Sequence, residues 1–216
     1  MTRKLLKIQL PSIGIEPTDN ILEPLAILLE ELYRWNSAIN LTAINSPQEA
    51  VEKHIIDSLT LLPFLPREIK LLDAGSGAGF PGLPLKICRP DITVFSVEAS
   101  KKKVYFQREV IRRLKLQNFL PLPVRLENLR SSHPELPLVD VVVSRALGST
   151  TDLAQTTSGY LKGGGYLIVM KGAAGNREAM DWQEKDSGLF LEDIHELNLP
   201  VSGAARKILV FRKRHF

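Results

Sequence analysis

The amino-acid sequence predicts an α/β protein: a doubly wound, mostly parallel sheet with an antiparallel C-terminal strand and an N-terminal helical extension. From residue 69 onward, short apolar runs alternate with helical stretches, which implies parallel strands joined by right-handed crossovers and buried on both faces. The last two β-like runs have no helix-length segment between them, so we expect them to pair antiparallel. The first 68 residues have helical periodicity instead.

The N-terminal segment contains two predicted helices. Residues 21–35 place apolar side chains at helical spacing. Residues 47–62 form the second helix, which Ser46 and Pro47 open. We therefore expect a helical extension over residues 1–68, packed on a domain that forms one structural unit from 69 to 216.

The predicted domain alternates strands with helices in chain order. The helices are expected at 81–88, 101–116 and 149–161, and Gly163, Gly164 and Gly165 are expected to make a turn into the fifth strand. Two further runs, 189–198 and 206–213, form the terminal pair. The first five strands are expected at 69–73, 92–98, 119–124, 138–144 and 165–171.

The composition is that of an ordinary globular protein, with 44% hydrophobic and 24% charged residues. No apolar run approaches the roughly 20 residues that span a bilayer, and the N-terminus lacks a signal-peptide pattern. A single cysteine and four scattered histidines predict neither a disulfide nor a metal site. We expect a cytoplasmic protein without a membrane partner.

The net charge of +4 is modest, but the basic residues are clustered. Residues 101–115 hold seven cations against one acid, and residues 206–214 add five more. Clustered cations favour a polyanionic partner, because neutralised phosphates release counterions. A solvated helix face and a charged terminus remain the alternative.

A glycine-rich loop follows the first predicted strand and matches the patterns of two cofactor classes. Residues 73–79 read Asp-x-Gly-x-Gly-x-Gly, and residues 77–82 read Gly-x-Gly-x-x-Gly. A dinucleotide site should begin one or two residues after the strand, at Gly75, but its third glycine would then fall on Phe80. Asp73 would repel a pyrophosphate, whereas it suits the amino or hydroxyl groups of S-adenosylmethionine. The loop therefore favours the methyl donor over a nicotinamide dinucleotide.

Polar residues also end the other predicted strands, at the edge where such sheets bind ligands. Glu98 could accept hydrogen bonds from the ribose hydroxyls of the cofactor. The alternative is that it is only a charge near the start of the next helix. Leu126 and Glu127 follow the third predicted strand, where they could contact the adenine amino group of the cofactor. Arg145 directly follows a buried strand, so we expect it to meet a carboxylate, phosphate or base edge. Lys171 points to the same edge or is an ordinary strand-end lysine.

Together these motifs resemble the bacterial methyltransferases that make N7-methylguanine in small-subunit ribosomal RNA, the glucose-inhibited division protein B family. The resemblance spans nearly the whole chain, and its motifs before and after the glycines are more specific than the glycines alone. The residues that carry it are Trp35-Asn36-x-x-x-Asn40-Leu41-Thr42, His54-x-x-Asp57-Ser58-Leu59, the loop from Asp73 to Pro84 with Phe80-Pro81-Gly82, Glu98-x-Ser100-x-Lys102-Lys103, Ser144-Arg145-Ala146, Lys171-Gly172 and the basic end from Arg206 to Lys213.

The resemblance implies a Rossmann-like methyltransferase fold, S-adenosylmethionine as cofactor, and a guanine of 16S ribosomal RNA as substrate. The expected nucleotide is 527, in the 530 loop, and the partner is that RNA or the small ribosomal subunit. No general base is expected, because guanine N7 has a free lone pair and loses no proton on methylation. No metal is expected, and the protein is expected to act as a monomer.

The predicted site has a cofactor set and an acceptor set. Arg145 is the best candidate to position the target guanine, and Asn40, His54 and Lys171 are weaker candidates. His54 could equally be a packed helix residue. Two alternatives stay open: a nicotinamide-dependent oxidoreductase and a non-catalytic RNA-binding protein of the same fold. The predicted cofactor contacts are Asp73, Gly75, Gly77, Gly79, Phe80, Glu98, Ala99, Ser100, Leu126, Glu127 and Arg145.

Overall fold

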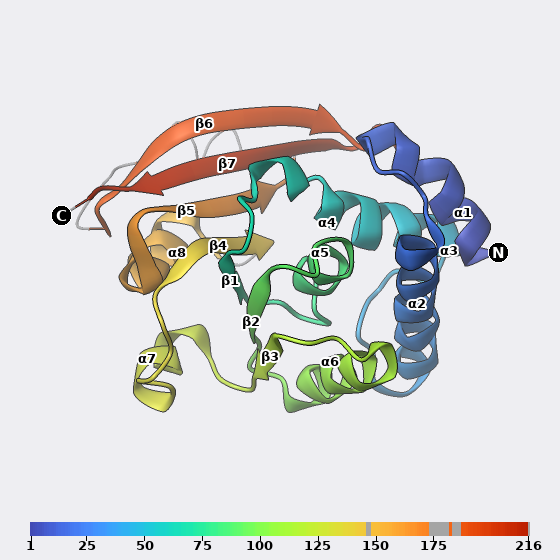
Figure 1. Cartoon of the computed structure of the whole chain (residues 1–216), viewed down its shortest axis with the longest axis horizontal. Helices are drawn as coiled ribbons and strands as arrows, with labels where there is room; N and C mark the ends of the chain where they lie inside the picture. The colour runs from blue at the N-terminus through green and yellow to red at the C-terminus, as the bar shows by residue number, and fades with distance from the viewer. Residues whose placement is uncertain (146–147, 173–181, 183–186, 216) are drawn as a thin grey trace.

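The central sheet has seven strands in the computed structural model, which describes residues 1–145, 148–172, 182 and 187–215. The strand order is β3-β2-β1-β4-β5-β7-β6 (Figure 1). Ala146 of the predicted Ser144-Arg145-Ala146 motif lies outside the described residues. The strands are β1 (Lys70–Ala74), β2 (Thr93–Val97), β3 (Phe119–Leu122), β4 (Val139–Arg145), β5 (Leu161–Lys171), β6 (Leu189–Asn198) and β7 (Ala205–Lys213).

The pairing within the sheet confirms the predicted topology. Strands β3, β2, β1, β4 and β5 are mutually parallel, and β7 runs antiparallel between β5 and β6. The strand order reverses between β1 and β4, which are neighbours. In open α/β sheets, ligands bind at the carboxyl ends of the strands beside such a reversal.

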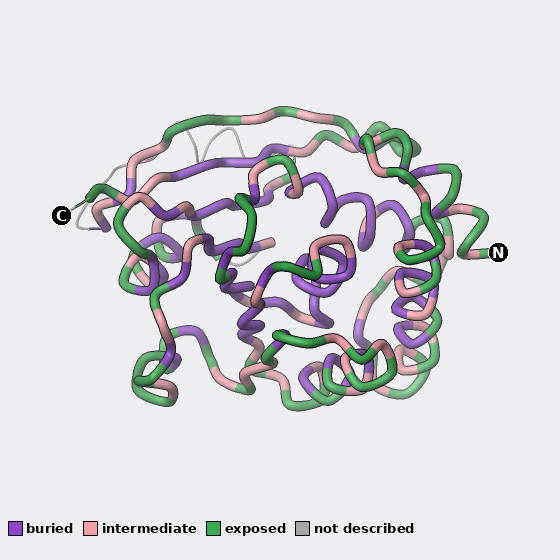
Figure 2. Tube along the Cα trace, viewed as in Figure 1, coloured by how far each residue is buried: buried purple, intermediate pink, exposed green. Residues whose placement is uncertain are grey.

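Successive residues of a strand pack against the layers on opposite faces of the sheet, because side chains alternate between the two faces of a strand. Leu71 and Val141 pack with the N-terminal helices, α5 (Gly82–Cys88) and α6 (Lys101–Leu114). Leu72 and Val142 pack on the other face, with the side of the molecule that carries α7 (Leu129–Ser132) and α8 (Thr150–Thr157). Figure 2 shows the inner strands as largely buried, whereas β6 at the edge of the sheet and the outer faces of the helices are more exposed.

The N-terminal segment is helical, as predicted, and the helix predicted over 21–35 is α2 (Asp19–Ile39), preceded by α1 (Thr2–Gln9). The second predicted helix, over 47–62, is helical from Pro47 to Leu59, but it is not one regular α-helix. The segment divides into α3 (Pro47–Ala50), the π-helical turn η2 (Val51–Ile56) and α4 (Asp57–Leu59). Wide π turns inside helices are rare and occur frequently at functional sites.

The predicted turn at the three consecutive glycines was wrong. Strand β5 begins at Leu161 and runs through them, with a shift in its register against β4. Gly164 has a φ of +78°, and a Cβ on Gly165 would lie 2.8 Å from the carbonyl oxygen of Asp140. The glycines therefore form an irregularity inside the strand where two backbones approach closely. The helix expected over 149–161 ends at Thr157 as α8 and continues as a short 3₁₀ turn.

Within the described ranges, no helix has the length and apolar character needed to cross a membrane. The buried leucines of α2 belong to one hydrophobic cluster with the residues on one face of the sheet, among them Leu71 of β1, Val141 of β4 and Ile208 of β7. The residues before position 69, which we call the head, are thus packed directly on the sheet that carries the candidate site.

Candidate active site

The loop after β1 is shaped by glycines in left-handed conformations. Gly75, Gly77 and Gly79 have φ values of 71°, 58° and 87°, which side chains disfavour. A Cβ on Gly79 would lie 2.5 Å from the Leu83 side chain, whereas a Cβ on Gly77 would meet nothing within 4 Å. The loop is therefore packed tightly on one side and open on the other, as the approach of a ligand requires.

Asp73 lies beneath this loop and is fully buried. Its Oδ2 accepts a hydrogen bond from the Gly82 N–H at 2.8 Å, which ties the end of β1 to the start of α5. A Cβ on Gly82 would come within 2.7 Å of that same oxygen. Burial raises the pKa of Asp73 to about 7, and its Oδ1 has no hydrogen-bond partner among the described residues. The carboxyl group anchors the loop and keeps one acceptor unused.

A buried polar network supports the same loop from below. Ser96 Oγ lies 2.7 Å from Ser76 Oγ and 2.8 Å from Gln107 Oε1. Gln107 Nε2 donates to the Gly77 carbonyl oxygen at 2.8 Å. These residues were not predicted from the sequence. Their signal is a polar side chain on a buried strand or helix face, where an apolar residue is the norm.

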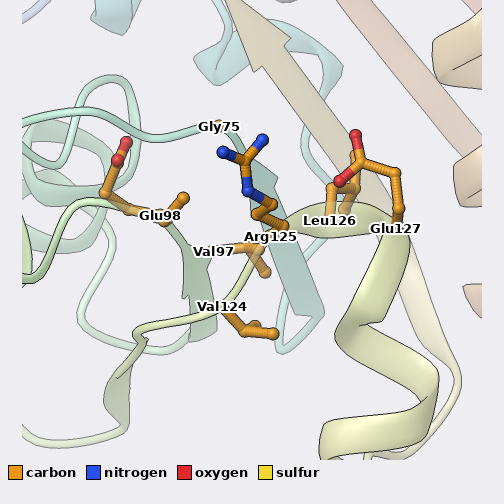
Figure 3. A pocket seen from close by; sticks show the side chains of 8 residues that line it. Gly75, Val97, Glu98, Val124, Arg125, Leu126 and Glu127 are labelled. Carbon is orange, nitrogen blue, oxygen red and sulfur yellow. The ribbon is translucent and has the colours of Figure 1, made fainter.

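A first hollow, of about 160 Å³, opens where β1 and β2 end (Figure 3). Five residues of the predicted cofactor set line it: Gly75, Glu98, Ala99, Leu126 and Glu127. Val97, Val124 and Arg125 also line it and were not predicted. The strand ends and the turn after β3 therefore converge on one cavity.

Glu98 performs two local tasks in this hollow. Its Oε2 accepts a hydrogen bond from the Gly77 N–H at 2.9 Å, and its Oε1 accepts one from the Ser100 N–H at 2.7 Å. The carboxylate thus joins the glycine loop to the start of α6, in agreement with the alternative that it is a charge near a helix start. Each carboxylate oxygen can accept a further hydrogen bond.

Phe80 connects the loop to a second region. Its ring is buried and stacks on the His54 ring, with 4.6 Å between centroids and 21° between planes. The Arg145 guanidinium carbon lies 5.6 Å from the centre of the Phe80 ring. Phe80 does not line the first hollow, and neither do Asp73, Gly77, Gly79, Ser100 and Arg145 of the predicted cofactor set.

A second hollow, of about 330 Å³, lies at the ends of β4 and β5. It brings together three of the four predicted acceptor residues, His54, Arg145 and Lys171. Asn40 does not line it, and is exposed at the end of α2 with a φ of 50°. The remaining lining comes from the head, β5, the segment after it and β7: Ile44, Lys53, Asp57, Met170, Gly172 and Arg206.

Arg145 is held in this second hollow by the head. It donates a hydrogen bond to the Lys53 carbonyl oxygen at 2.8 Å, and it lies 3.8 Å from Asp57 Oδ2. Burial lowers the pKa of Arg145, but a guanidinium titrates so far above neutrality that it stays charged. A fixed, charged fork therefore borders the hollow.

Asp57 of the motif His54-x-x-Asp57-Ser58-Leu59 also borders the second hollow. Its side chain is buried, and its Oδ1 accepts a hydrogen bond from Arg206 Nε at 2.9 Å. Burial raises the pKa of Asp57, while Arg206 and Arg145 oppose that rise. The carboxylate therefore links the head to both β4 and β7.

His54 is a neutral packed ring in this structure. Its Nε2 lies 3.0 Å from Thr42 Oγ1, while its Nδ1 is buried with no partner among the described residues. Burial lowers the pKa of His54 to about 3.

Lys171 Nζ donates to the Gly148 carbonyl oxygen at 3.1 Å. Among the described residues, no group of three or more His, Cys, Asp or Glu side chains is placed to hold a metal ion.

The two hollows lie at the carboxyl edge of one sheet and share the glycine loop. Gly75 of the loop lines the first, and Phe80 of the loop contacts two residues of the second. This arrangement suits a reaction between two ligands, one held by the loop and the other by the cationic fork beside it.

Comparison with known proteins finds relatives that match nearly the whole chain. The sequence model described as rRNA small subunit methyltransferase G matches residues 21–210. A protein of Syntrophotalea carbinolica named ribosomal RNA small subunit methyltransferase G is 41% identical over 207 residues, which is 95% of each chain. A protein of the same name from Geotalea uraniireducens is 41% identical over 213 residues, covering 98% of this chain and 96% of its own.

The fold is shared with solved structures of much lower sequence identity. A SAM-dependent methyltransferase from Aquifex aeolicus superposes with a TM-score of 0.54 and 18% identity, over 76% of this chain and 92% of the other. At this identity the similarity concerns the fold. The methyltransferase fold expected from the sequence is therefore confirmed.

Proposed function

The chain belongs to the rRNA small subunit methyltransferase G family, and we propose that it methylates N7 of a guanine in 16S ribosomal RNA, with nucleotide 527 of the 530 loop as the expected target. The family relationship makes the chain an S-adenosylmethionine-dependent enzyme that methylates small-subunit ribosomal RNA. The observation that carries the proposed site is the pair of hollows on either side of Phe80. One suits the cofactor and the other suits the acceptor base.

The first hollow has the chemistry of an adenosine site. Glu98 offers carboxylate lone pairs to ribose hydroxyls, and Glu127 offers acceptors to an adenine amino group. The open side of Gly77 leaves room for a ligand against the backbone. When bound, S-adenosylmethionine supplies an electrophilic methyl group on a sulfonium centre. The unpartnered Oδ1 of Asp73 is a further acceptor beneath the loop.

The second hollow has the chemistry of an acceptor site for a nucleotide. Arg145 is immobilised by the Lys53 carbonyl oxygen and the Phe80 ring, so its remaining N–H groups can orient a base edge or phosphate. Lys171 and Arg206 add positive charge around the same hollow. Because the head supplies His54 and Asp57 to this hollow, we propose that residues 1–68 act with residues 69–216 in binding the substrate.

The residues of the second hollow act by binding and orientation. Guanine N7 presents a lone pair and loses no proton, so the site needs no general base. His54 suits this chemistry because it is neutral and packed on Phe80. Rate enhancement then comes from holding the two reactants in line, which can account for about 7 to 11 kcal/mol of a barrier. We propose that the protein does this as a cytoplasmic monomer.

Calorimetry with two ligands tests the cofactor assignment. We expect S-adenosylmethionine to bind with one site per chain, NAD to show no binding, and Glu98→Ala to weaken the binding of S-adenosylmethionine by about tenfold or more, since a charged hydrogen bond contributes about 1.5 to 3 kcal/mol. Binding of NAD alone would support the oxidoreductase alternative. Binding of neither ligand would support a non-catalytic RNA-binding protein.

A further inference from the structure

Helix α6 carries an exposed stripe of four residues. Lys101, Tyr105, Arg108 and Arg112 follow one another at spacings of four, three and four residues, which places them on one face of a helix. All four are exposed, and 58% of the Tyr105 surface is open to solvent. We call these residues the α6 stripe. An aromatic ring thus lies between cations along the outside of the helix.

The cations next to Tyr105 are not neutralised by acids. In the part of the chain that the structure describes, neither Lys101 nor Arg108 has a carboxylate within ion-pair distance, whereas Arg112 pairs with Glu109 at 2.6 Å. The Arg108 guanidinium carbon lies 6.0 Å from the centre of the Tyr105 ring. The Tyr105 ring therefore lies beside one free cation, Arg108, and about one helical turn from the other, Lys101.

The first turn of α6 is electrostatically unfavourable for the helix itself. Lys101, Lys102 and Lys103 occupy it, and it contains no acid. The amino end of a helix carries partial positive charge, so cations there destabilise the helix. A bound anion would reverse this penalty, because helix amino ends bind phosphates well. Glu98 accepts the Ser100 N–H just before the helix and offsets part of this charge, but the three lysines leave this end of α6 positive.

The stripe begins at the rim of the cofactor hollow. Ala99 lines that hollow, and Lys101 starts α6 two residues later. The opposite face of α6 holds the glycine loop through Gln107, which donates to the Gly77 carbonyl oxygen. The outer face is thereby fixed relative to the reaction site.

We propose that the α6 stripe binds a single-stranded segment of ribosomal RNA close to the target guanine, with one base stacked on Tyr105 and phosphates on Lys101 and Arg108. This inference rests on the proposed function for the identity of the RNA. Unpaired bases stack on exposed aromatic rings and on guanidinium groups, and lysines bind the backbone. A tyrosine flanked by free cations matches this chemistry.

The test compares stripe variants with a charge-matched control. The stripe variants are Tyr105→Ala, Tyr105→Phe and the double variant Lys101→Ala with Arg108→Ala. The control is the double variant Lys4→Ala with Lys7→Ala, which removes two exposed cations from α1. Three quantities are measured: affinity for deproteinised 16S RNA lacking the modification at several salt concentrations, kcat and KM on unmodified small subunits, and affinity for S-adenosylmethionine.

The expected results separate stacking from charge. Tyr105→Ala should weaken RNA binding by about fivefold to a hundredfold, since stacking of one base contributes about 1 to 3 kcal/mol, and Tyr105→Phe should keep most of the affinity. The double stripe variant should lower the slope of log affinity against log salt by about 1.4, or about 0.7 for each lost phosphate contact. In the Tyr105→Ala and double stripe variants, KM for small subunits should rise. Their affinity for S-adenosylmethionine should equal that of the protein without substitutions.

Two outcomes would overturn the stripe proposal: RNA binding by the stripe variants that equals that of the control, or a loss of S-adenosylmethionine affinity with RNA binding intact. The second would mean that α6 only supports the cofactor loop. If the unmodified protein binds the RNA through the stripe but transfers no methyl group, the proposed function fails and the stripe proposal stands.

Discussion

Asp57 of the head and Arg206 of β7 form an ion pair whose carboxylate is buried, with 2.9 Å between Oδ1 and Nε, although 149 residues separate them in the chain. The same carboxyl group lies 3.8 Å from Arg145 at the end of β4. Three elements therefore meet at one carboxylate beside the second hollow. Without it, the positive charges of Arg145 and Arg206 would lose the buried carboxylate that both approach.

Replacing Asp57 tests this meeting point. We expect Asp57→Asn to lower the free energy of unfolding by about 3 to 5 kcal/mol, because removing one partner of a buried pair leaves the other charge uncompensated. The matched control is Asp19→Asn, which breaks the exposed pair with Arg3 and should cost at most about 1 kcal/mol. Urea unfolding measures both. Equal losses in the two variants would contradict a structural role for Asp57.

Arg145 is the residue expected to matter most for transfer. Arg145→Ala should reduce kcat on small subunits by about 10²-fold or more, the scale seen when one preorganised donor is lost at a reacting centre, while the fold stays intact. Arg145→Lys keeps the charge but loses the planar fork, so it should stay strongly impaired. Thermal unfolding monitors the fold. Near-normal kcat in Arg145→Ala would remove this residue from the site.

Gly82→Ala tests the anchor beneath the cofactor loop. The new Cβ would lie 2.7 Å from Asp73 Oδ2, the atom that accepts the Gly82 N–H. We expect a loss of about 1 to 3 kcal/mol in stability, the usual cost of a buried polar group that loses its partner, together with weaker binding of S-adenosylmethionine. Gly159→Ala is the control, because a Cβ there meets nothing within 4 Å. Unchanged cofactor affinity in Gly82→Ala would argue against the anchor.

The pH dependence of stability should reveal His54. Its pKa is about 3 in the folded protein because of burial, against about 6.5 in an unfolded chain. As the pH falls below 6.5, only the unfolded state gains this proton, so the folded state loses up to about 1.4 kcal/mol per pH unit until pH 3. Burial raises the pKa of Asp73 to about 7, which acts in the opposite direction between about pH 4 and 7.

A comparison with His54→Gln therefore isolates the histidine. Relative to the unmodified protein, the variant should gain about 2 kcal/mol of unfolding free energy between pH 7 and pH 5, since only the histidine term disappears. Urea unfolding at both pH values measures the difference. Parallel pH profiles for the two proteins would show that His54 has the same pKa in the folded and the unfolded state.

Local pattern was enough to predict most of the sheet. The alternation of apolar runs and helices yields β1 to β5 in parallel order, and residues at strand ends fall together because parallel strands end at one edge. This explains why Gly75, Glu98 and Leu126 line one hollow as expected. The sheet face on which Asp73 lies was also predictable from the alternation of side chains along a strand. Leu72 and Ala74 share one face, so Asp73 must point to the other.

Contacts between distant segments were not predictable in this way. The pairing of Asp57 with Arg206 depends on how the head packs against β7, which no local pattern specifies. The π turn η2 likewise depends on packing with distant segments. Its residues Lys53 and His54 contact Arg145 and Phe80, respectively. The glycine irregularity in β5 depends on the close approach of Asp140. Such features require the neighbouring strand or helix to be known.

Mapping the transferred methyl group tests the central proposal most directly. Small subunits that lack the modification are incubated with the protein and S-adenosylmethionine labelled in its methyl group, and the labelled nucleotide of 16S RNA is identified. We predict label on N7 of guanine 527, lost with Arg145→Ala and retained with the Lys4→Ala and Lys7→Ala control. Label at another nucleotide or another atom, or no label at all, would contradict the proposed function.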